Sequence, residues 1–95
     1  MEADADNAVV IEAGDIYYEP EAVAAATGPI RFTLENVGVV EHDLVVEEVG
    51  DVEVVHAEAG ETASGTIELE PGTYTFYCSI EGHRTAGQEG RLEVG

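Results

Sequence analysis

Turn-forming residues recur at short intervals along the whole chain, and this spacing limits what the chain can fold into. The segments between the turns are rich in Val, Ile, Tyr, Phe and Thr. Such segments are too short for typical helices, and β-branched and aromatic residues favour strands. The turn signals are Gly14-Asp15, Thr27-Gly28-Pro29, Asn36-Val37-Gly38, Gly50-Asp51, Gly60-Glu61, Pro71-Gly72 and Gly82.

Several of these segments alternate apolar with polar residues, as strands with one buried face do. Ile30, Phe32 and Leu34 share one face of such a segment. Phe76 and Cys78 share one face of another. The candidate strands are Ala8–Ala13, Ile16–Tyr18, Ala22–Ala25, Ile30–Asn36, Asp43–Glu48, Val52–Ala57, Ala63–Leu69, Thr73–Cys78 and Arg91–Val94.

Short strands without intervening helices predict an all-β fold, an antiparallel Greek-key β-sandwich of about seven to eight strands. The length of 95 residues corresponds to one domain. We expect this domain to span residues 8–95, after a frayed acidic N-terminus at residues 1–7. This first segment has neither the basic region nor the apolar region of a signal peptide.

The charge balance excludes several classes of partner. The chain has 21 acidic residues, three Arg and no Lys, for a net charge of −18. Nucleic acids and anionic lipid surfaces are polyanions, so neither is an expected partner. No apolar run approaches the ~20 residues that span a bilayer. A soluble acidic domain, adaptation to high salt, a designed composition and steering toward a basic partner all remain open interpretations.

One Cys and two His form a pattern that predicts a metal site. The single Cys excludes an internal disulfide. Cys78 ends an expected strand, His83 and Gln88 follow at intervals of five residues, and His42 opens a strand about 36 residues earlier. A thiolate with two imidazoles favours copper, and an amide oxygen can act as a weak axial donor. Zinc also binds thiolate and imidazole. A lone Cys is usually a small core residue, so the prediction of a metal site rests on the combination of Cys78 with His42, His83 and Gln88.

These motifs resemble the cupredoxin (type 1 blue copper) family over most of the chain. The similar segments are Val40–Leu44, Glu70–Cys78 and the Gly82-His83 loop. The resemblance implies one copper ion that cycles between Cu(I) and Cu(II). It implies that the equatorial ligands are His42, Cys78 and His83, and that the axial ligand is Gln88.

Gln88 departs from the usual pattern of this family. The small plastocyanin- and azurin-type proteins usually carry Met at this position, and the only Met here is Met1. A stellacyanin-like Gln implies a lower reduction potential, because an oxygen donor favours Cu(II). Engineered replacement of Met by Gln88 stays open as an alternative.

The same resemblance implies a one-electron carrier, not an enzyme, located outside the cytoplasm (periplasmic, secreted or at the cell surface). It implies a monomer that meets a redox protein, with a basic docking surface matching the acidic chain. His83 is the expected electron port, with a small apolar patch formed by Ile80, Gly82, Ala86 and Gly87. The alternatives are a copper carrier or storage domain and a metal-free β-sandwich binding module.

Several further residues have expected roles around this site or away from it. We expect Asn36, or the backbone near Val40–Glu41, to rigidify the site, and the backbone N–H of Ser79 to donate a hydrogen bond to the Cys78 sulfur. His56 lies in the middle of an expected strand, and an exposed structural His is the favoured interpretation. The less favoured alternative is a second Cu(II) or Zn(II) site with nearby Glu58.

Overall fold

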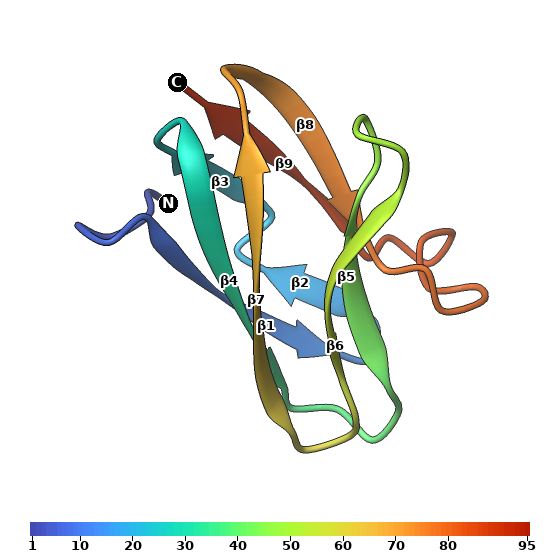
Figure 1. Cartoon of the computed structure of the whole chain (residues 1–95). Coiled ribbons are helices and arrows are strands. Elements are labelled where there is room, and N and C mark those ends of the chain that lie inside the picture. Colours follow the sequence, from blue (N-terminus) through green and yellow to red (C-terminus); the bar gives the residue numbers. More distant parts are fainter.

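Two β-sheets face each other in the computed structural model, which describes residues 1–95 (Figure 1). One sheet has the strand order β2-β1-β4-β7, and the other has the order β3-β9-β8-β5-β6. Their nine strands slightly exceed the expected number and are β1 (Ala8–Gly14), β2 (Tyr17–Glu19), β3 (Ala22–Ala25), β4 (Gly28–Asn36), β5 (His42–Val46), β6 (Val52–Ala57), β7 (Thr62–Leu69), β8 (Gly72–Tyr77) and β9 (Glu89–Val94). The all-β sandwich predicted from the sequence is confirmed.

The alternating strands bury their apolar faces between the two sheets. Ile30, Phe32 and Leu34 of β4 are completely buried, while Arg31 and Glu35 on the other face of the strand are exposed. This is the alternation expected of a strand with one face in a core. The core therefore sits between the sheets and holds their strands in a fixed register.

Two of the strand pairings are parallel, although the sequence predicted an antiparallel sandwich. β1 pairs with β4 in parallel, and β3 pairs with β9 in parallel. In both cases the partners are separated along the chain by at least one other strand. An alternating pattern defines which face of a strand is buried, but it carries no information on the direction of the neighbouring strand.

The first residues of the chain lie along β3. The backbone N–H of Ala3 donates to the Ala24 carbonyl at 2.7 Å, and that of Ala24 donates to the Met1 carbonyl at 2.8 Å. The Asn7 side chain bonds to the backbone of residues 26 and 29. Fraying of residues 1–7 and a single domain at 8–95 stay predictions.

The structure contains no helix with the length and apolar character that crossing a membrane requires.

The topology brings two distant chain segments together at one end of the sandwich. β5 and β8 are antiparallel neighbours, so the start of β5 lies near the end of β8. His42 is the first residue of β5, and Cys78 directly follows β8. The loop from β8 to β9 projects from this end, and both chain termini lie at the other (Figure 1). The fold therefore places His42 and Cys78 beside a loop that carries His83.

Candidate metal centre

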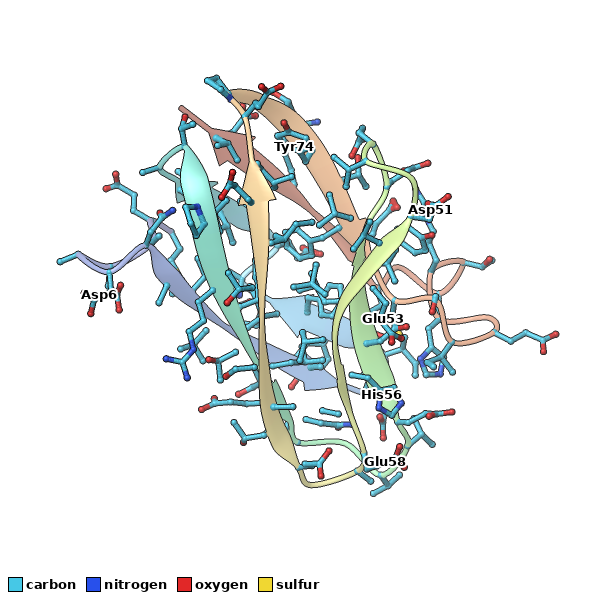
Figure 2. The ribbon with its side chains drawn as sticks, in the orientation of Figure 1. Asp6, Asp51, Glu53, His56, Glu58 and Tyr74 are labelled. Carbon is cyan, nitrogen blue, oxygen red and sulfur yellow. The ribbon has the colours of Figure 1, made fainter.

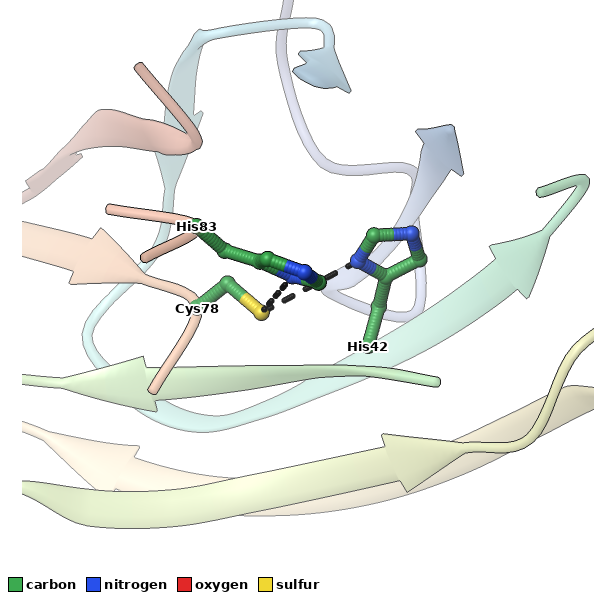
Figure 3. A group of neighbouring side chains, drawn as sticks. All are labelled: His42, Cys78 and His83. Atoms are coloured by element: carbon green, nitrogen blue, oxygen red, sulfur yellow. Dashed lines mark hydrogen bonds between the residues drawn. The ribbon is translucent and has the colours of Figure 1, made fainter. Parts of the chain in front are cut away.

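Three nitrogen and sulfur donors meet where β5 begins and β8 ends. The Cys78 Sγ lies 3.9 Å from His42 Nδ1 and 3.5 Å from His83 Nδ1 (Figure 3). The two imidazole rings are tilted against each other, with their centroids 4.9 Å apart. All three donor atoms lie within 4.8 Å of one another, which is close enough for one metal ion. Three residues singled out by their spacing in the sequence are thus brought together in space.

The sheet and the loop each contribute to this cluster. His42 and Cys78 are 0% and 1% exposed, respectively, because both project into the end of the core. His83 is half-buried and lies in the loop between β8 and β9. Backbone hydrogen bonds close this loop, from Cys78 N–H to the Gln88 carbonyl at 3.1 Å and from Gln88 N–H to the His83 carbonyl at 3.1 Å. The two ends of the loop are therefore bonded to each other, and His83 is bonded to the end that leads into β9.

Gln88 is completely buried, and its amide orientation is fixed by the backbone. Its Nε2 donates to the Tyr17 carbonyl at 2.7 Å and to the Gly14 carbonyl at 3.2 Å. Both carbonyls can only accept, so the NH₂ group must face them. The Oε1 atom consequently points into the cluster, 2.9 Å from His42 Nδ1.

Asp15 orients the buried imidazole from its other side. The Asp15 Oδ1 lies 2.8 Å from His42 Nε2, and its Oδ2 accepts the Val39 N–H at 2.8 Å. These hydrogen bonds, that of Val39 first and that of His42 second, lower the pKa of Asp15 below its ordinary value. A Cβ on Gly38 would lie 2.1 Å from this carboxylate, so any other residue there would displace the carboxylate from its present position. The sequence showed Asp15 only as part of a turn signal.

The contacts of His42 test whether the donor set suits a cation. Its two ring nitrogens face two acceptors, the Asp15 carboxylate and the Gln88 amide oxygen. A neutral imidazole carries one N–H and can satisfy only one of them. When Nε2–H donates to Asp15, Nδ1 and Oε1 face each other as two lone pairs, which a cation between them would stabilise. The residues present therefore fit a metal ion.

The Cys78 thiol is protonated in the metal-free protein at neutral pH. Burial raises its pKa to about 11, and the backbone N–H groups of Asp43 and Ile80 oppose this shift only in part. A metal bound to sulfur takes the thiolate form, so binding must release this proton.

Ser79 is hydrogen-bonded to the Asp43 carboxylate. The Ser79 N–H donates to Asp43 Oδ1 at 2.7 Å, and the Ser79 hydroxyl donates to Asp43 Oδ2. The prediction that Ser79 N–H donates to the Cys78 sulfur is therefore wrong. A carboxylate oxygen accepts an N–H more strongly than sulfur does, because sulfur is a weak hydrogen-bond acceptor. This contact ties the start of the ligand loop to β5.

Asn36 rigidifies the approach to His42, as predicted. Its Nδ2 donates to the Val40 carbonyl at 2.8 Å and to the Ala57 carbonyl at 3.0 Å. Its Oδ1 accepts the Gly38 N–H at 2.9 Å. The side chain thereby joins the loop between β4 and β5 to the end of β6.

Arg84 holds the outer side of the ligand loop. Its guanidinium lies 2.7 Å from Glu47 and 3.1 Å from Glu89, and it stacks over the Tyr77 ring at 4.2 Å. Nothing in the sequence indicated this role, since Arg84 has no spacing relation to its two carboxylates. Of the four residues expected to form an apolar patch, Ile80 packs partly against the core, and the exposed ones are Gly82, Ala86 and Gly87.

Comparison with known proteins identifies the family. Residues 1–88 match the cupredoxin-like domain family. This match covers most of the chain, and the chain therefore belongs to the cupredoxin family.

Solved structures share this fold at low sequence identity. A dithionite-reduced auracyanin from Roseiflexus castenholzii is 19% identical, with a TM-score of 0.78 over 97% of this chain and 99% of that one. The metal-binding domain of the Cu(I)-exporting P-type ATPase CopA from Streptococcus pneumoniae D39 is 20% identical, with a TM-score of 0.77 over 100% and 94%. A multicopper oxidase is 16% identical, with a TM-score of 0.75 over 97% of this chain but 44% of that one. At these identities the comparisons establish the fold.

Proposed function

We propose that the protein is a type 1 copper protein that carries single electrons. The observation that carries the proposal is the convergence of His42 Nδ1, Cys78 Sγ and His83 Nδ1 at the buried end of the sandwich. Two imidazoles and a thiolate are the donor set of blue copper sites, with a weak axial ligand. Membership of the cupredoxin family supports the same function.

Four residues would hold the copper ion. His42, Cys78 and His83 would be the equatorial ligands, and the Gln88 Oε1 the axial one. Bound copper supplies the one-electron couple between Cu(I) and Cu(II). Asp15 and the two carbonyls that accept from Gln88 keep the donor atoms in place, so little rearrangement is needed when the charge changes.

His83 would be the port through which the electron enters and leaves. It is the only one of the four proposed ligands that is not fully buried, and exposed small residues of the loop flank it. The net charge of −18 favours a redox protein with a basic docking surface, met in a weak, salt-dependent encounter. We further propose that the protein acts as a monomer outside the cytoplasm, as the family resemblance implies.

The proposed function does not include catalysis. In this family, oxidase chemistry needs a second copper centre built from additional His residues. His56 is the only His outside the cluster, and it lies in β6 beside Glu41 and Glu58.

Voltammetry of the copper-loaded protein tests the carrier function directly. We expect a reversible one-electron wave whose potential does not drift over repeated cycles. A zinc-loaded sample is the matched control and should show no wave. Copper that binds but cannot be reduced and reoxidised reversibly would contradict the carrier function.

A copper carrier or storage domain is the second candidate. It is favoured by the structural similarity to the metal-binding domain of a Cu(I)-exporting ATPase. A carrier that hands over its ion should lose Cu(I) rapidly to a competing chelator. An electron carrier should retain its copper, and the burial of three of the four proposed ligands favours this outcome here. The rate of Cu(I) transfer to a colorimetric chelator therefore separates the two functions.

A further inference from the structure

A second group of metal-ligating side chains lies on the outer surface of β5 and β6. Glu41 directly precedes β5, His56 lies in β6, and Glu58 directly follows β6. The His56 Nε2 is 2.7 Å from Glu41 Oε2 and 3.4 Å from Glu58 Oε2. One donor atom from each residue lies within 4.8 Å of the others. Figure 2 shows His56 and Glu58 close together at one end of β6.

Strand register explains why these three residues meet. In the antiparallel pair of β5 and β6, His42 lies opposite Ala57, and Asp43 lies opposite His56. Continuing this register by one residue places Glu41 opposite Glu58. Ala57 is buried in the core, so the alternation of the strand turns His56 outward. The register thus adds Glu41 to the pair of His56 and Glu58 that the sequence analysis named as a less favoured metal site.

The cluster is accessible to an ion from solution. The side chains of Glu41, His56 and Glu58 are 47%, 34% and 67% exposed, respectively. The imidazole presents Nε2 to both carboxylates, so a single ion could contact all three groups with water completing its coordination. A buried His satisfied within the core would not have this geometry.

Negative charge exceeds positive charge around His56. Two carboxylates lie side by side, and His56 is the only basic group that pairs with either. The chain has no Lys, and the ion pairs of Arg84 are made with Glu47 and Glu89. The pKa of His56 is raised, first by its hydrogen bond to Glu41 and also by the charges of Glu58 and Glu53. A divalent cation would neutralise more of this negative charge than one proton does.

We propose that Glu41, His56 and Glu58 form a surface site for a divalent transition metal ion, Zn(II) or Cu(II), separate from the His42–Cys78–His83 cluster. One imidazole nitrogen and two carboxylate oxygens are ligands that both ions accept, with water in the remaining positions. The ion takes the place of the proton on His56 Nε2. An imidazolium releases that proton to solvent on binding, whereas a neutral imidazole keeps its single proton on Nδ1. The site does not depend on the proposed electron-carrier function.

Zn(II) titration of a Cys78→Ser chain, followed by calorimetry and amide NMR, tests this site. Removing the thiol weakens the other cluster and leaves the surface site intact. We expect one equivalent of Zn(II) to bind with saturable shifts at residues 41, 56 and 58. Adding His56→Gln should abolish that equivalent, and adding Glu58→Gln should weaken binding by ~10-fold or more.

Glu68→Gln is the matched control for charge, because Glu68 is an exposed residue of β7 outside the cluster. It should leave Zn(II) binding unchanged. The wild-type chain gives an independent measurement, since shifts at His56 and Glu58 report on this site whatever binds at Cys78. Unsaturable shifts spread over the acidic surface, or equal Zn(II) binding with and without His56, would overturn the proposal.

Discussion

The two His residues of the buried cluster are held in opposite ways. His42 is completely buried in a sheet, and its Nε2 is bonded to Asp15. His83 is half-buried in a loop, and its Nε2 has no hydrogen-bond partner in the protein. One imidazole is therefore fixed from both sides, whereas the other is fixed on one side and open to solvent on the other. The difference is consistent with the proposed roles, in which His42 fixes the geometry of the centre and His83 passes electrons to and from a partner.

Replacing each His by Gly separates these two roles most strongly. His42→Gly leaves a cavity in a packed region, and we expect the free energy of unfolding to fall by about 2–4 kcal/mol. His83→Gly removes a loop side chain, so the fall should be under about 1 kcal/mol. Urea unfolding of the two metal-free variants measures both values.

Added imidazole tests the same difference between His42 and His83. It should restore the visible copper band in His83→Gly, because that position opens to solvent. It should not restore the band in His42→Gly to the same extent, because the cavity is enclosed by the core. Equal rescue of both variants would contradict the distinction between a fixed and an open ligand.

Copper uptake should depend on pH through the thiol that both imidazoles face. The pKa of Cys78 in the metal-free protein is about 11, so below that pH one proton must leave on binding. The apparent affinity should therefore rise about tenfold per pH unit between about pH 8 and 10. Competition with a chelator of known affinity at several pH values gives the slope. A slope of zero would mean that the thiolate is not a ligand.

Gln88 lies on the fixed side of the centre, and Gln88→Met tests whether its oxygen is the axial ligand. A thioether favours Cu(I) more than an amide oxygen does, so the reduction potential should rise by about 100 mV. Voltammetry of the variant beside the wild type gives the shift. An unchanged potential would show that the Gln88 Oε1 does not contact the metal.

Replacing Asp15 should also raise the reduction potential, but by less than Gln88→Met does. Asp15→Asn keeps an oxygen acceptor for the His42 N–H but removes a negative charge that favours Cu(II). We expect the potential to rise by about 40 mV, which corresponds to ~1 kcal/mol. Asp6→Asn is the matched control, because Asp6 is exposed (Figure 2) and the N-terminal segment lies at the opposite end of the sandwich from the loop that carries His83 (Figure 1). Equal shifts in both variants would mean that only overall charge matters.

The sequence predicted the parts of this molecule that follow from local pattern. Alternation located the strands, and the spacing of Cys78, His83 and Gln88 identified residues that the structure brings together with His42. The parallel pairing of β1 with β4 and the contact of Asp15 with His42 depend on how distant strands are arranged. No local pattern encodes that arrangement. The Ser79 N–H was misassigned because the sequence did not reveal that the Asp43 carboxylate lies beside it.

Titration of the metal-free protein with Cu(II), followed by visible absorption, tests most directly whether His42, Cys78 and His83 form a copper centre. We expect an intense thiolate-to-copper band that saturates at one equivalent in the wild type. The band should be absent in a Cys78→Ser variant whose circular dichroism shows an intact sandwich. A wild-type protein that stays colourless with Cu(II), or a variant that keeps the band, would contradict the proposed copper centre.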